Sequence, residues 1–196
     1  SDVIKHPNWN MGHKISVDSA TLMNKLFELI EASKIFNLPM NKFDIIIHPK
    51  SYVHALVNFK NGLSKILIHD TQMEIPIFGA IFDNTSETYL KNKDINFQNL
   101  NGENFIKPSN SIFPLLKLIK ECRRNDSYYE IILVTVNDYF VKKFLSGNIN
   151  FQKMQTKLLK KLKDPHLTKY YNKYPKKIND IYIMVNKVKK YLYDKK

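Results

Sequence analysis

The chain has 196 residues, of which 43% are hydrophobic and 25% charged, a composition that is typical of globular domains and excludes a wholly disordered chain. One cysteine excludes an intrachain disulfide framework and a multi-cysteine zinc site, and no apolar run reaches the roughly 18 residues of a membrane-spanning helix. None of the five glycines belongs to a GxGxxG motif or a P-loop, so these residues contain no nucleotide-binding fingerprint. The chain starts at Ser1 rather than Met, so we expect a piece of a longer protein.

The formal net charge of +13 comes from the second half of the chain. Residues 1–111 carry 11 basic and 11 acidic side chains, whereas residues 112–196 carry 20 basic and 7 acidic ones. This break predicts two structural units joined by an asparagine-rich linker over 83–111. A basic half can bind nucleic acid, but its lysines are dispersed and no nucleic-acid motif accompanies them. We therefore interpret them as solvated helix faces and expect no nucleic-acid partner.

The first predicted elements belong to a mixed unit over residues 1–82. Apolar residues at three- and four-residue spacing predict a helix over 20–36, with Asp18 or Ser19 as its N-cap. The apolar run 43–47 predicts a short buried strand.

The next signals predict a β-hairpin. The runs 51–59 and 63–68 flank the pair Asn61-Gly62, which adopts positive φ at little cost and is typical of hairpin turns. Residues 74–82 then indicate a short helix.

Beyond the linker, the sequence predicts a helical bundle over 112–196. Apolar residues recur at helical spacing in the stretches 112–124, 128–146, 151–163 and 178–193. Gly147 lies where a helix C-cap is expected. The predicted fold class is α+β, a mixed α/β segment with a β-hairpin followed by a small C-terminal helical bundle.

Polar side chains with a chemical use gather near the start of the first predicted helix. Ser19, Asn24 and Lys25 offer a hydroxyl, an amide and an ammonium group close to a helix N-terminus, which favours a phosphate. Glu28 projects from the same face and can bind a divalent metal. Spacing alone equally allows an ordinary Lys25–Glu28 ion pair with Ser19 as a helix cap.

The only tryptophan precedes this helix. Trp9 lies in a loop that contains asparagine and glycine, between His6 and Gly12. Such a loop suits a mobile lid over a site, and it equally suits a surface loop anchored by one aromatic ring.

The run from His6 to Glu28 resembles the flap and phosphate-site signature of the 1-deoxy-D-xylulose-5-phosphate reductoisomerase family. It reads HPNWNMG, then KISVDSAT, then MNK with a glutamate three residues on. The similarity continues in HPKSYVH at 48–54 and in QM and IPI at 72–77, and more weakly in INF at 95–97, FPLLKL at 113–118 and VND at 136–138.

This resemblance implies an enzyme of the non-mevalonate isoprenoid pathway. Such an enzyme uses NADPH and Mn²⁺ or Mg²⁺ to rearrange and reduce 1-deoxy-D-xylulose 5-phosphate to 2-C-methyl-D-erythritol 4-phosphate, with the metal as a Lewis acid. The family's N-terminal NADPH-binding domain and its Asp-x-Glu metal ligands are absent from these residues. We therefore expect the chain to carry part of an active site and to be inactive alone.

The resemblance also implies the groups that hold the substrate and the metal. Ser19, Asn24 and Lys25 would bind the substrate phosphate, and Glu28 would bind both the substrate and the metal ion. His6 would contact the substrate from the flap. Of these residues, His6, Lys25 and Glu28 would be catalytic.

The remaining implied roles concern the flap and the cofactor. Trp9 and Met11 would close over the substrate, Gly12 and Met73 would contact NADPH, and His54 would support the site from the strand behind it.

Two local departures from the family pattern bear on the site. The family has glycine after the lysine, where this chain has Leu26; the larger side chain either crowds the site or packs on the rear face of the helix. The run 69–72 replaces a Gly-x-Pro-Asp sequence, so we expect a differently shaped loop before Met73.

The alternative interpretation is a degenerate, non-catalytic relative whose basic C-terminal helices bind nucleic acid or an acidic partner. For the whole enzyme we expect a homodimer, a small sugar-phosphate substrate and no membrane association. The expected location is the bacterial cytoplasm, or a plastid-type organelle in a eukaryote.

Overall fold

The computed structural model describes residues 12–82, 97–101, 104–122 and 127–194, and these form two compact units. The helical unit draws its described residues from 12–44 and 109–194, and the hairpin unit draws its own from 45–108. The grouping does not follow the expected boundary at 83–111, because the helices of 12–44 share a core with the C-terminal helices. The division into a catalytic segment, a linker and a helical domain stays a prediction.

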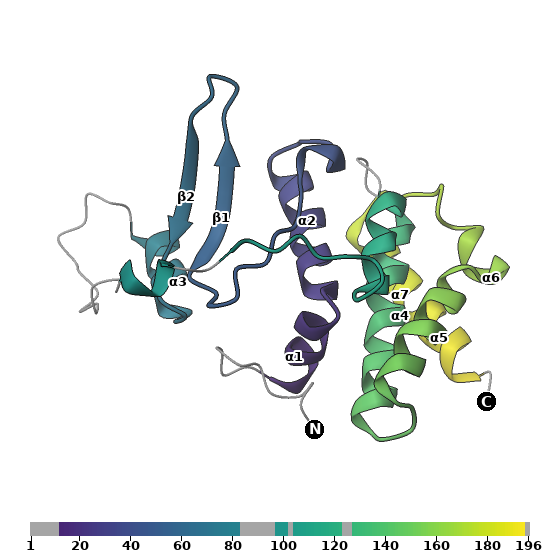
Figure 1. Cartoon of the computed structure of the whole chain (residues 1–196). Helices are drawn as coiled ribbons and strands as arrows, with labels where there is room; N and C mark the ends of the chain where they lie inside the picture. The colour runs from purple at the N-terminus through teal and green to yellow at the C-terminus, as the bar shows by residue number, and fades with distance from the viewer. Residues whose placement is uncertain (1–11, 83–96, 102–103, 123–126, 195–196) are drawn as a thin grey trace. The chain divides into compact units, whose positions relative to one another are not determined.

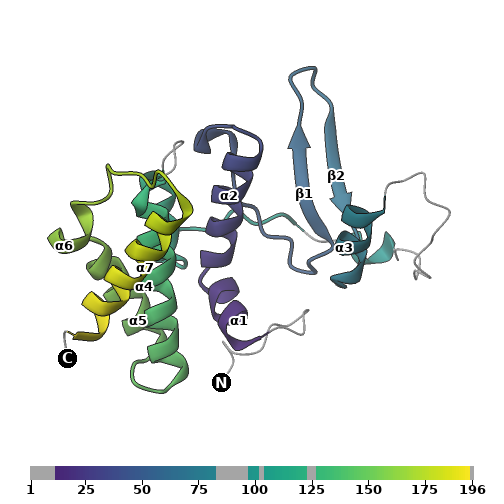
Figure 2. The same cartoon turned by 180° about the vertical axis from the view of Figure 1, so that it is seen from behind.

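The helical unit is built around one long helix, α4 (Tyr128–Leu145), which packs beside α5 (Phe151–Leu162) and α7 (Ile178–Asp194) in both views (Figures 1 and 2). Its other elements are α1 (His13–Ala20), α2 (Met23–Ile35), the 3₁₀ helix η2 (Met40–Lys42), the 3₁₀ helix η4 (Pro114–Glu121) and α6 (Pro165–Thr168).

A single hydrophobic core joins these helices. Val136 of α4, Met154 of α5 and Val188 of α7 are fully buried in it, together with Val17 of α1. The one cysteine, Cys122, belongs to the same core, and its thiol donates a hydrogen bond to the Leu118 carbonyl at 3.4 Å.

Local signals set both ends of α4. At its start, Ser127 and Glu130 form a capping box. The Ser127 hydroxyl accepts a hydrogen bond from the Tyr129 N–H, and the Glu130 carboxylate accepts one from the Ser127 N–H. At its end, Gly147 adopts φ +75°, and its N–H donates to the Phe144 carbonyl at 2.9 Å. The N–H of Asn148 donates to the Lys143 carbonyl, which completes a Schellman motif. The predicted C-cap glycine is confirmed.

The first predicted helix is two helices. α1 ends at Ala20 and α2 starts at Met23, because Leu22 between them takes a left-handed conformation with φ +59°. Asp18 and Ser19 therefore lie inside α1, and the prediction that either is an N-cap is wrong; the N-cap of α1 is Gly12.

The other helical predictions fare differently. The stretches 128–146, 151–163 and 178–193 are confirmed as α4, α5 and α7. The predicted helix over 112–124 is instead the 3₁₀ helix η4, which starts at Pro114.

The hairpin unit contains β1 (Val53–Asn58), β2 (Ser64–Ile68), α3 (Glu74–Ile81) and the 3₁₀ helix η3 (Phe97–Leu100). The strands pair antiparallel in the register Ala55↔Leu67 with an irregularity at His54. Gly62 takes φ +85° in the turn, so the hairpin prediction is confirmed.

The predicted strand over 43–47 is wrong. Among the described residues this run has one isolated bridge, in which Ile47 exchanges hydrogen bonds of 2.8 and 2.9 Å with Ile106. Ile45 is buried as expected, at 4% exposure, but burial alone does not make a strand without a longer partner.

The fold class is α+β, and the described residues form helices and one two-stranded antiparallel sheet. Within the part of the chain that the structure describes, no helix is both long and apolar enough to cross a membrane.

Candidate active site

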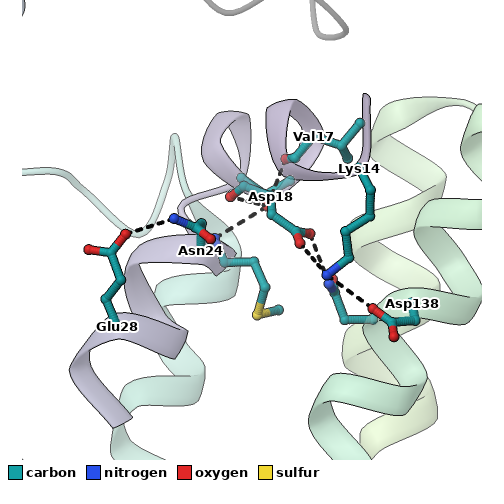
Figure 3. A network of polar contacts seen from close by, with 9 residues as sticks. Lys14, Val17, Asp18, Asn24, Glu28 and Asp138 are labelled. Carbon is teal, nitrogen blue, oxygen red and sulfur yellow. Dashed lines mark hydrogen bonds and ion pairs between the residues drawn. The ribbon is translucent and has the colours of Figure 1, made fainter. Parts of the chain in front are cut away.

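Three of the predicted site residues meet on one face of α2. The Asn24 side-chain amide donates to Glu28 Oε1 at 2.7 Å (Figure 3), and the Lys25 ammonium lies 2.5 Å from Glu28 Oε2. The side chains of Lys25 and Glu28 are 41% and 46% exposed, so a ligand can reach them from solvent. We call Asn24, Lys25 and Glu28 the α2 polar cluster.

The opposite face of α2 enters the core. Met23, Leu26 and Leu29 recur at helical spacing and are buried, with Leu26 only 1% exposed. The sequence left open whether Leu26 crowds the site or packs on the rear face of the helix, and in the structure it packs on the rear face. The α2 polar cluster is therefore not crowded by this side chain.

Ser19 approaches the same region from the preceding helix. It lies in the last turn of α1, half-buried, and its carbonyl accepts the N–H of Leu22 at 3.0 Å. The Thr21 hydroxyl is 3.1 Å from the carbonyls of Val17 and Asp18 and accepts the Met23 N–H at 3.3 Å. A turn of only two residues thus separates the helix of Ser19 from the helix of the α2 polar cluster.

A second polar network lies on the other side of α1 and was missed by the sequence analysis. Asp18 accepts a hydrogen bond from the Asn137 side-chain amide at 2.8 Å and forms an ion pair with Lys14 at 2.7 Å. Lys14 also contacts Asp138 at 3.1 Å (Figure 3). The i,i+4 spacing of Lys14 and Asp18 was a usable signal. No local sequence pattern predicts the contact between Asp18 and Asn137, which are 119 positions apart.

Burial and charge act in opposite directions on this network. Burial raises the pKa of Asp18 above its ordinary value and outweighs the hydrogen bond from Asn137 and the contact with Lys14. Burial alone would lower the pKa of Lys14, but its contacts with Asp18 and Asp138 outweigh this effect and raise it. The ion pair favours the charged form of both α1 groups, but at Asp18 the effect of burial is larger.

The predicted flap residues lie mainly beyond the structural description. His6, Trp9 and Met11 fall outside the described residues, so their roles stay predictions. Gly12 is exposed, and among the described residues, its chain neighbours aside, no atom lies within 4 Å of the position that a Cβ would occupy there. That open space is compatible with close approach of a ligand.

His54 and Met73 belong to the hairpin unit. The His54 ring stacks on His69 with 3.6 Å between centroids, and its Nε2 is 3.1 Å from the His69 carbonyl. His69 in turn is only 9% exposed, and its Nδ1 is 2.6 Å from the Asp70 carbonyl. Met73 precedes α3 and is 57% exposed.

The run that replaces the family's Gly-x-Pro-Asp sequence forms a closed turn. The Asp70 carboxylate accepts the Thr71 N–H at 2.7 Å, and the Asp70 carbonyl accepts the Gln72 N–H at 2.8 Å. These contacts give the loop before Met73 a defined shape without glycine or proline.

Glu28 fits a divalent metal as one ligand among several. Its carboxylate is accessible and is the oxygen type that Mg²⁺ and Mn²⁺ prefer. No group of three or more His, Cys, Asp or Glu side chains able to hold a metal occurs among the described residues. A complete site of this kind needs further oxygen ligands from elsewhere.

Comparison with known families decides which protein class these residues represent. A family model described as 1-deoxy-D-xylulose 5-phosphate reductoisomerase C-terminal domain matches residues 1–36, and another described as DXP reductoisomerase C-terminal domain matches residues 69–191. The chain belongs to the DXP reductoisomerase family. The resemblance of its motifs is thereby confirmed.

Curated reductoisomerases align over most of the chain. The one from Pelagibacter ubique is 48% identical over 180 residues, which are 92% of this chain and 46% of the relative. The one from Sulfurihydrogenibium sp. is 37% identical over 182 residues, which are 93% of this chain and 47% of the relative. The chain spans about half the length of the curated relatives it matches.

Solved reductoisomerases share the fold. A DOX-P reductoisomerase in complex with NADPH, fosmidomycin and magnesium matches with a TM-score of 0.89 at 30% identity, over 98% of this chain and 48% of that one. The Zymomonas mobilis enzyme in complex with NADPH matches with a TM-score of 0.82 at 28% identity, over 98% and 48%.

Proposed function

We propose that this chain is the C-terminal part of an enzyme that converts 1-deoxy-D-xylulose 5-phosphate to 2-C-methyl-D-erythritol 4-phosphate, with NADPH and Mg²⁺ or Mn²⁺. The observation that carries the proposal is the α2 polar cluster, in which an amide, an ammonium and a carboxylate share one accessible helix face. Family membership and the NADPH and magnesium in the related structures support it.

The residues of α1 and α2 bind and orient the substrate phosphate in this proposal. Lys25 donates charge-assisted hydrogen bonds to the phosphate, and Asn24 and Ser19 add neutral donors. Lys25 and Asn24 now contact Glu28, so a phosphate has to replace these contacts. Exposed ion pairs of this kind contribute only about 0.2–1 kcal/mol, so the exchange costs little.

The same exchange leaves the Glu28 carboxylate free to bind the metal ion. When bound, the metal supplies Lewis acidity at the substrate oxygens and NADPH supplies hydride. His6, Trp9 and Met11 close over the substrate and exclude water. Gly12 and Met73 contact the cofactor, and His54, held by its stacking on His69, supports the site. A homodimer and a bacterial cytoplasmic location of the whole enzyme stay predictions.

The test uses a hybrid enzyme in which this chain replaces the matching segment of the Pelagibacter ubique relative. We expect NADPH consumption that depends on the sugar phosphate, measured by absorbance. Glu28→Gln should abolish most of the turnover while the melting temperature stays unchanged, because it removes a charged metal ligand that is exposed. Glu31→Gln, also exposed on α2, is the matched control and should turn over normally.

A hybrid that folds but does not turn over, beside an active parent relative, would overturn the proposal. That outcome would favour the non-catalytic alternative, whose basic helices bind nucleic acid or an acidic partner.

A further inference from the structure

We infer that Asn137 of α4 is a positioning residue for the proposed phosphate site, which it sets in place by holding Asp18 of α1. The inference rests on the proposed function of the α1–α2 corner, defined as residues 18–25. It assigns a role to the VND run at 136–138, which the α2 polar cluster does not explain.

Two consecutive residues of α4 bind α1 at two positions one helical turn apart. Asn137 donates to Asp18 Oδ1 at 2.8 Å, and Asp138 lies 3.1 Å from the Lys14 ammonium. Lys14 and Asp18 are themselves 2.7 Å apart, which closes the network (Figure 3). Asn137 and Asp18 are each only 1% exposed, so this part of the network is shielded from water.

Packing alone does not account for an amide at this position. Asn137 belongs to a stretch of α4 whose buried neighbours include Leu133, Val136 and Phe140. Its Oδ1 has no hydrogen-bond partner among the described residues. A buried acceptor without a partner is destabilising, so an apolar side chain would suit the core better. What the amide adds is the hydrogen bond to Asp18.

The hydrogen bond between Asn137 and Asp18 holds α1 at the residue next to the proposed phosphate ligand Ser19. Asp18 precedes Ser19, and its carbonyl lies 3.1 Å from the Thr21 hydroxyl that ends α1. Leu22 follows in a left-handed conformation with φ +59°, and α2 begins at the next residue. Because only Thr21 and Leu22 join the helices, a shift of the end of α1 moves the start of α2 with it.

The first test measures amide hydrogen exchange in the 196-residue chain. Asn137→Ala should accelerate exchange of the Thr21 and Leu22 N–H groups roughly ten- to hundredfold, since a hydrogen bond to a buried charged group is lost. Ser127→Ala is the matched control, because it removes the N-cap of α4 without touching α1. Equal acceleration by the control, or none by Asn137→Ala, would overturn the inference.

A rescue variant separates positioning from general loss of stability. Asn137→Asp sets two carboxylates against each other and should accelerate exchange at the α1–α2 corner. Combining it with Asp18→Asn restores one donor and one acceptor and should bring exchange back to within a few-fold of the unmodified chain. Failure of this pair to recover would count against the inference.

Kinetics of the hybrid enzyme link the contact to the site. Asn137→Ala should raise KM for the sugar phosphate about tenfold or more and leave KM for NADPH unchanged, while Ser127→Ala changes neither. An unmodified hybrid without turnover would overturn the proposed function, yet the exchange data would still decide the positioning role. Faster exchange at the corner with an unchanged sugar-phosphate KM would show that the contact is structural only and would overturn the inference.

Discussion

Lys25→Ala separates a substrate-binding lysine from an ordinary helix ion pair. The Lys25–Glu28 pair has i,i+3 spacing, and its two side chains are 41% and 46% exposed. Pairs of this kind contribute about 0.2–0.5 kcal/mol, and alanine is at least as good a helix former as lysine. Loss of the pair should therefore change the free energy of unfolding by less than about 0.5 kcal/mol.

Loss of a phosphate contact should have a much larger effect. A hydrogen bond to a charged group contributes about 1.5–3 kcal/mol, which corresponds to roughly a ten- to 150-fold rise in KM for the sugar phosphate. KM for NADPH should stay within about twofold, since the proposed cofactor contacts are Gly12 and Met73. The assay pairs steady-state kinetics of the hybrid enzyme with urea unfolding of the same variant.

Lys42→Ala is the control for a general loss of positive charge. Lys42 is exposed in η2 of the same unit and has no proposed role. If both variants weaken sugar-phosphate binding equally, long-range charge and not a direct contact explains the effect. If Lys25→Ala lowers stability and both KM values change together, the lysine is structural and the phosphate assignment is wrong.

A helix C-terminus, a buried carboxyl group and the lone metal ligand each have a measurable consequence. Asn37 ends α2 in a left-handed conformation with φ +49°, so Asn37→Gly should raise the free energy of unfolding by up to about 1 kcal/mol in urea titrations, and Asn37→Ala should lower it. The pKa of Asp18 in the folded state is raised above 3.8. Protonation of Asp18 therefore contributes fully to the free energy of unfolding below pH 3.8, and this contribution is lost as the pH rises through the folded-state pKa. Asp18→Asn should remove this decline from a plot of urea midpoint against pH. The isolated chain should consume no NADPH with the sugar phosphate and bind Mn²⁺ only weakly by calorimetry, because Glu28 is a single ligand; tight Mn²⁺ binding would contradict the partial-site interpretation.

Local signals predicted the elements that local interactions create. Gly147 predicted the C-cap of α4, and Asn61-Gly62 predicted the hairpin turn. The Ser127–Glu130 capping box is also a local signal, but it was not predicted. The break between α1 and α2 could not, because leucine at position 22 gives no sign of a positive φ. The prediction of a strand over 43–47 was wrong because strand formation there depends on pairing with a distant segment, and the structure has only the isolated Ile47–Ile106 bridge among the described residues.

The candidate site divides in the same way. Helical spacing was enough to place Asn24, Lys25 and Glu28 on one face of α2. It could not choose between a phosphate site and an ion pair, and only the longer motif pointed to the reductoisomerase family. The contact between Asp18 and Asn137 depends on tertiary packing, which no spacing within one segment reveals.

The single cysteine makes the helical core observable without an added label. Burial, with the nearby Glu130 and Glu121 charges, raises the pKa of Cys122 to about 12, so almost no reactive thiolate exists near neutral pH in the folded chain. An alkylating reagent can therefore modify this thiol at an appreciable rate only while the core around it is open. The rate of iodoacetamide labelling reports that opening directly, and intact mass spectrometry can follow it for every variant as one added group.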